Sequence, residues 1–282
     1  LIAFALLYMS TIFSQSEYNI MRSLGPNNWA GRMLSIAVRD GNEIWAGSHS
    51  GGLWRSFTAG VGKKAWQRIV TAPPEAQCVG TVAFDPNNKD FIIIGTGAKN
   101  FLPIQLADYL AENLSGGIFW SNDGGVTWEK SFIEDHNSNQ LSLENESVND
   151  IIFDNNQGKT RIFAASSNGL YYSDDMGKTF TQKSSYGDYR NIRIDPVTGY
   201  IYASCGGYKG LNAGNNNRYI MRSTDHGDNF TPIKICYSLK DPNDPNSVQI
   251  ESSMAKPMIS IYNNVLYCMT INPDGSQPPS KP

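Results

Sequence analysis

The sequence has few of the residues that build metal and redox sites. Its 282 residues include only three histidines, His49, His136 and His226, and they lie far apart along the chain. Metal sites normally need histidine, cysteine or carboxylate ligands at short, regular spacings, and no such spacing is present. We therefore expect no metal site and no cofactor.

Cysteine is also scarce, and the four copies are well separated: Cys78, Cys205, Cys236 and Cys268. An even number of cysteines fits an oxidising compartment, but their spacing does not resemble a zinc site. One disulfide bond and buried free thiols are both compatible with this pattern. The sequence leaves these two alternatives open.

Excess positive charge is missing as well. The formal net charge is −3, the sequence pI is about 5.6, and only 17% of the residues are charged. Nucleic-acid-binding proteins usually carry a strongly basic patch, so we expect no nucleic-acid partner. The acidic segment 241–246 lacks the glycine and the final glutamate of an EF-hand loop, so we interpret it as a turn-rich linker rather than a calcium loop.

The apolar run at the amino end, residues 1–13, is too short to span a membrane and is followed by small polar residues. This pattern predicts a partial signal peptide over residues 1–16 and a secreted or cell-surface protein; a buried strand or helix is the alternative. No cysteine follows the run, which argues against a lipoprotein anchor. We expect no membrane span in the chain.

What the sequence does contain is a repeated motif of the form Ser-x-Asp-x-Gly-x-Thr/Asn-aromatic. Its three copies are Ser121–Trp128, Ser173–Phe180 and Ser223–Phe230. They start 173 − 121 = 52 and 223 − 173 = 50 residues apart. A constant period of about 50 residues is typical of repeat architectures.

Each period also contains four short runs rich in β-branched and aromatic residues, bounded by Gly, Pro, Asn and Asp. Four strands per period predict the blades of an all-β propeller. We expect antiparallel four-stranded blades at about 30–75, 76–133, 148–183 and 190–232, and an incomplete fifth blade from about 256. The first blade is degenerate: Trp66 takes the aromatic place, and the motif aspartate is missing.

The repeated motif has a structural explanation. It lies between the third and fourth strands, where aspartate can bind backbone N–H groups, glycine can adopt a left-handed conformation, and the aromatic ring can be buried. Copies in different blades cannot all belong to one catalytic site. The residues predicted to be structural are Ser121, Asp123, Gly125, Thr127, Trp128, Ser173, Asp175, Gly177, Thr179, Phe180, Ser223, Asp225, Gly227 and Phe230.

These motifs resemble the Asp-box, or bacterial neuraminidase repeat, except that Asn229 stands where threonine is usual. The stretch 24–56, with Gly51-Gly52-Leu53-Trp54, is similar to the start of large secreted bacterial Asp-box proteins, which are themselves similar to sortilin-type and xyloglucanase-type propellers. The resemblance implies that residues 17–282 form a truncated propeller. It also implies that a segment like 18–24 supplies the outer strand of a last blade that this fragment lacks.

The longest insertions all fall at one end of the predicted blades, at about 98–115, 133–147, 205–218 and 233–257. The first contains a predicted short helix at 103–114. Loops of this length are usually functional or disordered, so we expect any binding surface at this end. The candidate binding residues are His49, Tyr109, Tyr189, Arg190, Tyr208 and Lys209, with ordinary surface positions as the alternative for each.

Three functional classes fit a propeller: a secreted binding module for glycans or cell-surface partners, a glycoside hydrolase, and a sorting or assembly factor. The resemblance to xyloglucanases implies an aspartate just before Gly51-Gly52, but Ser48-His49-Ser50 stands there. A sialidase needs an arginine triad, and the sequence shows no set of residues that would complete such a triad with Arg32. We therefore predict a binding module without catalytic activity in this segment. A glycoside hydrolase whose two carboxylates lie outside the segment remains the alternative.

Overall fold

The computed structural model describes residues 32–62, 64–98, 115–134, 140–141, 143, 146–156, 158–184, 187–206, 218–233, 255–263 and 265–271. Within these ranges the regular structure consists of β-strands, and no helix is long and apolar enough to cross a membrane. The predicted signal peptide, the segment 18–24, the helix 103–114, the linker 241–246 and Cys236 all lie outside the described residues.

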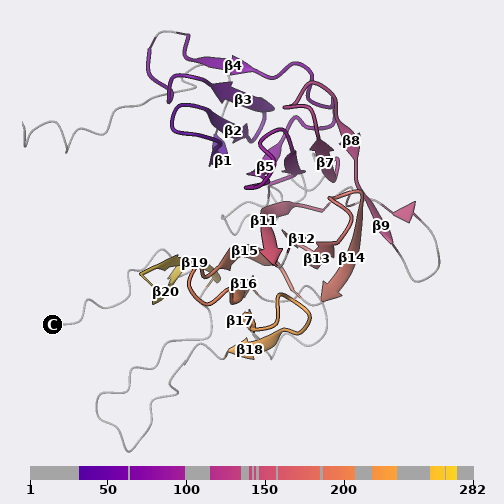
Figure 1. Ribbon diagram of the computed structural model, residues 1–282, viewed down its shortest axis with the longest axis vertical. Coiled ribbons are helices and arrows are strands. Elements are labelled where there is room, and N and C mark those ends of the chain that lie inside the picture. Colours follow the sequence, from indigo (N-terminus) through magenta and orange to yellow (C-terminus); the bar gives the residue numbers. More distant parts are fainter. Residues whose placement is uncertain are drawn as a thin grey trace, which may run out of the picture.

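In the described part of the chain, twenty strands form five sheets (Figure 1). The first sheet contains β1 (Met33–Val38), β2 (Ile44–Ser48), β3 (Leu53–Ser56) and β4 (Trp66–Arg68). The second contains β5 (Val79–Phe84), β6 (Ile92–Thr96), β7 (Ile118–Ser121) and β8 (Glu129–Lys130). The fourth contains β15 (Tyr189–Ile194), β16 (Ile201–Gly206), β17 (Arg218–Ser223) and β18 (Thr231–Ile233), and the fifth contains β19 (Ala255–Tyr262) and β20 (Val265–Ile271).

The third sheet has the same four-stranded unit and two extra strands. The unit consists of β11 (Val148–Asn156), β12 (Lys159–Ser166), β13 (Gly169–Ser173) and β14 (Thr179–Ser184), and the extra strands are β9 (Phe132–Glu134) and β10 (Gln140–Leu141). Each four-stranded unit pairs its strands antiparallel, in chain order. The predicted all-β fold of four-stranded antiparallel blades is therefore confirmed.

The interpretation of residues 133–147 as a loop insertion is wrong in part, because this stretch contributes two short strands. Strand β9 pairs with β14 in parallel, with Phe132 opposite Thr179, and β10 then pairs with β9. An outer blade strand such as β14 otherwise leaves backbone N–H and C=O groups unpaired. The link leaving the second blade covers that edge, which ties the second and third blades together.

The hydrophobic core lies between successive blades. One cluster joins Trp45 and Leu53 of the first blade to Val79 and Ile92 of the second, and equivalent clusters join the second to the third and the third to the fourth. The first strand of each blade contacts the first strand of the next, from β1 to β5, β11, β15 and β19. These inner strands therefore surround a common axis, and the ends of the blades define its two ends.

Candidate functional site: the axial pocket

At one end of the axis, the repeated motifs form turns whose polar groups bind one another. In the second blade, Ser121 Oγ accepts a hydrogen bond from the Gly125 N–H at 2.9 Å and donates to Asp123 Oδ1 at 2.8 Å. Asp123 also accepts bonds from the N–H groups of Val126 and Thr127. The Thr127 hydroxyl and N–H, followed by the Ser121 hydroxyl, lower the pKa of Asp123 to about 2.

The other two motif copies repeat this geometry. Gly177 and Gly227 donate to Ser173 Oγ and Ser223 Oγ at 2.9 and 2.8 Å. The degenerate first blade keeps the same serine–glycine bond, from the Gly60 N–H to Ser56 Oγ at 2.9 Å, without the aspartate. These turns use their polar groups internally, so this end offers little chemistry to a ligand.

At the opposite end of the axis, the pairing of the inner strands shows the same irregularity in each described sheet. The pairing of each inner strand with its neighbour shifts register near the start of the inner strand. In four blades one extra residue produces the shift: Leu34, Gly80, Asn149 and Arg190. Such β-bulges redirect side chains and are common beside functional sites.

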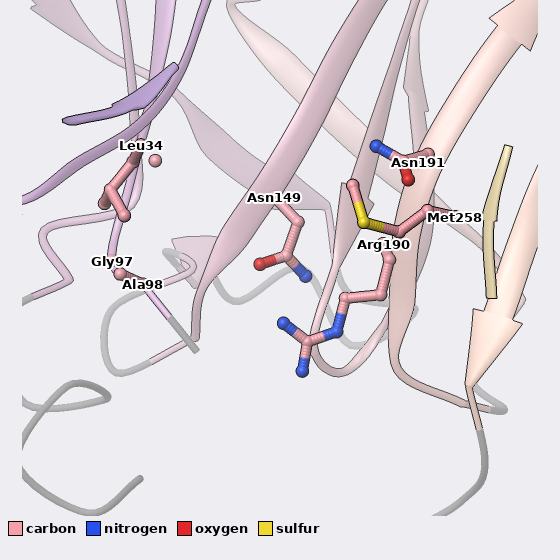
Figure 2. A pocket seen from close by; sticks show the side chains of 8 residues that line it. Leu34, Gly97, Ala98, Asn149, Arg190, Asn191 and Met258 are labelled. Carbon is pink, nitrogen blue, oxygen red and sulfur yellow. The ribbon is translucent and has the colours of Figure 1, made fainter. Parts of the chain in front are cut away.

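The bulged residues surround a pocket with a volume of about 120 Å³ (Figure 2). All five inner strands contribute to it, because Met258 of β19 joins the four bulged positions. Gly97 and Ala98, just after β6, complete one wall together with Leu34, while Asn149, Arg190 and Asn191 form a polar wall. This pocket lies at the end of the blades where the sequence predicted the binding surface.

Arg190 is held in place by a buried ion pair. Its Nε and Nη2 atoms donate to Asp188 Oδ2 at 3.0 and 2.7 Å, and both side chains are 5% exposed. A buried charge is tolerated when it is paired and hydrogen-bonded. The pair therefore fixes the orientation of the guanidinium group beside the pocket.

Two carboxamide groups bring oxygen atoms to the same region. Asn149 Nδ2 donates to the Tyr189 backbone oxygen at 2.7 Å, which leaves the Asn149 oxygen on the pocket side (Figure 2). Asn191 is 9% exposed, and its Oδ1 atom has no hydrogen-bond partner among the described residues. A buried polar atom without a partner is costly, so the Asn191 oxygen is suited to accept a bond from a ligand.

The candidate residues from the sequence fall into three groups. Tyr189 and Arg190 are buried, so the alternative of ordinary surface positions is wrong for them, and Arg190 lines the pocket. His49 is half-buried in the turn after β2, and desolvation, followed by the charge of Arg32, lowers its pKa. Tyr109, Tyr208 and Lys209 lie outside the described residues.

Most residues of the pocket are not marked by any pattern in the sequence. Leu34, Gly80, Asn149 and Met258 have no common chemistry, so nothing marks them as a group in the sequence. Their position in the chain is the signal that could have identified them. Leu34, Gly80 and Asn149 each follow the first apolar residue of an inner strand. An alignment of the inner strands that allowed one extra residue could have found these positions.

The chemistry of the pocket suits binding. No aspartate or glutamate is among the described residues that line it, so these residues offer the pocket no carboxylate pair of the kind that glycoside hydrolysis uses. The nearby Asp150 binds the Ile192 N–H at 3.1 Å and the Arg193 side chain, and thereby joins β11 to β15. No group of three metal-ligating side chains occurs in the described part of the chain.

Known structures share this fold. An ancestral GH74 enzyme matches with a TM-score of 0.56 and 20% identity over 88% of this chain and 32% of its own length. The extracellular domain of a putative hybrid two-component system from B. thetaiotaomicron matches with a TM-score of 0.53 and 11% identity over 89% of this chain and 31% of its own. The chain thus spans about a third of each. No protein-family model and no curated protein matches it.

Proposed function

We propose that this propeller segment is an extracellular binding module whose ligand enters the axial pocket. The observation that carries the proposal is the convergence of four bulged residues and Met258 on one hollow. Concave sites that combine apolar walls with a few polar groups are typical of ligand pockets. The extracellular location rests on the predicted signal peptide and is compatible with the fold it shares with an extracellular domain.

A binding role fits the pocket better than a catalytic one. The lining residues provide a guanidinium group, carboxamides and apolar side chains, which can orient a ligand. General acid–base catalysis normally uses histidine, aspartate or glutamate, and none of these is among the described residues that line the pocket. The likeness to the GH74 enzyme concerns the fold alone and adds no argument for hydrolysis.

The test is to fill the pocket and measure binding. Leu34→Trp enlarges a half-buried side chain on its wall, and Ile36→Trp enlarges an exposed side chain, 67% accessible, two residues along the same strand. We expect ligands recovered from glycan and peptide arrays to lose at least tenfold in affinity with Leu34→Trp and less than twofold with Ile36→Trp. Equal affinities for the two variants would refute the axial site.

A further inference from the structure

We infer that the axial pocket binds a peptide by accepting one of its short polar side chains. This inference rests on the proposed binding function and adds the class of ligand. The expected side chain carries an N–H or O–H donor on a short apolar stem, as in serine, threonine, asparagine or glutamine. Three features support this: the size of the hollow, its unused acceptors and its apolar wall.

The size of the hollow limits what can enter it. A cavity of about 150 Å³ in another protein holds one benzene molecule. The axial pocket, at about 120 Å³, therefore matches the volume of a single side-chain-sized group. The remainder of the ligand must lie outside the hollow, as the backbone of a peptide would.

The two carboxamide oxygens on the polar wall require a hydrogen-bond donor from the ligand. Asn191 Oδ1 is buried without a partner, and Asn149 binds Tyr189 through its nitrogen, so its oxygen is left for the pocket. Both atoms are acceptors. An incoming amide or hydroxyl group satisfies them, and a carboxylate or an aliphatic side chain does not.

The opposite wall favours a peptide over a glycan. Leu34 and Ala98 form it, Met258 adds an apolar side chain beside Asn191 (Figure 2), and no aromatic ring of the described residues lines the pocket. Sugar rings usually stack their C–H faces on aromatic side chains, whereas methionine and leucine adapt to irregular peptide side chains.

The experiment uses the full chain and a displayed library of random heptapeptides. We expect selection to enrich sequences that share one serine, threonine, asparagine or glutamine, and a synthetic consensus peptide to bind. Alanine at that position should weaken binding at least tenfold. Leu34→Trp should do the same, and Ile36→Trp should change affinity less than twofold.

A glycan array tested in parallel distinguishes a failure of the peptide inference from a failure of the proposed binding function. If a glycan binds, no peptide is enriched, and Leu34→Trp abolishes the glycan signal, then the peptide inference fails and the proposed binding function stands. If peptides are enriched but bind Leu34→Trp and Ile36→Trp equally, the peptide inference and the proposed axial binding function both fail. Failure of both libraries to yield a pocket-dependent ligand likewise overturns both.

Asn191→Leu gives a readout that a purely structural role would not produce. The substitution removes the unpartnered oxygen and keeps a similar volume. It also removes the long 3.4 Å bond from Asn191 Nδ2 to Asp150 Oδ2, while Asp150 retains its bonds to Ile192 and Arg193. We expect the melting temperature of the free protein to stay unchanged or rise, and peptide affinity to fall at least tenfold. A lower melting temperature with unchanged affinity would show that Asn191 serves only the fold.

Discussion

The two ends of this propeller differ in how they use equivalent positions in successive blades. At the motif end, Ser121, Ser173 and Ser223 make the same bonds in three blades. At the pocket end, the equivalent bulged positions hold residues as different as leucine, glycine, asparagine and arginine. Both ends are built on one repeated backbone.

The difference separates the requirements of folding from those of binding. A repeat that folds the same way in each blade needs the same turn chemistry each time. A site on the axis exists once, so each blade can contribute a different group to it. The repeated residues therefore describe the fold, and the variation at matched positions marks the site.

The largest difference between the ends should come from core packing. Phe180, at the motif end, is fully buried, so Phe180→Ala should lower the free energy of unfolding by about 3–5 kcal/mol. Leu34, at the pocket end, is half-buried beside a hollow, so Leu34→Ala should cost about 1 kcal/mol. Urea unfolding of the full chain measures both, and similar losses would contradict the comparison.

A second pair of variants tests how tightly the motif turns pack on the preceding blade. Gly227 has φ of 81°, and a Cβ atom there would collide with the buried Phe163 ring. Gly227→Ala should therefore cost about 3 kcal/mol, from left-handed strain and overpacking together. Gly158 has φ of 80° with open space around it, so Gly158→Ala isolates the strain and should cost about 1 kcal/mol.

Two fully buried serines provide the sharpest comparison of polar groups. Ser173 Oγ, at the motif end, binds Gly177 and Asp175, so Ser173→Ala should lower the free energy of unfolding by about 2 kcal/mol. Ser147 Oγ, at the pocket end, has no hydrogen-bond partner among the described residues. Ser147→Ala should therefore be neutral or stabilising, and a loss as large as that of Ser173→Ala would refute the contrast.

The smallest expected effect is a pH dependence confined to the motif end. The Asn229 N–H and then the Ser223 hydroxyl lower the pKa of Asp225 from 3.8 to about 2. Its bonds therefore stabilise the fold above about pH 4, and this contribution is lost as the pH falls towards 2. The melting temperature of Asp225→Asn should lie below that of the unaltered protein at pH 6, and the gap should narrow by pH 2.5.

Asn149→Ala provides the control for that measurement, because Asn149 does not titrate. Its difference in melting temperature from the unaltered protein should be similar at pH 6 and pH 2.5. If the Asp225→Asn gap were equally constant, the bonds of the Asp225 carboxylate would contribute nothing to stability.

Sequence patterns predicted the blades well because each blade follows from local rules. Strand length, β-branched residues and turn residues act within about 50 residues, and the period repeats them. The extra strand β9 escaped prediction because its pairing with β14 joins segments about 47 residues apart, Phe132 and Thr179. Nothing in Phe132–Glu134 itself indicates which edge it will cover.

The sequence by itself determined the repeat, the blades and the turns, since their polar groups find partners a few residues away, as Asp225 does with Ser223 and Asn229. Only the tertiary structure decided where the pocket lies. Leu34 and Met258 are separated by most of the chain, and both line the pocket because the inner strands surround one axis. Such a site depends on the register of five strands, and a single bulged residue in four of them changes which side chain faces the axis.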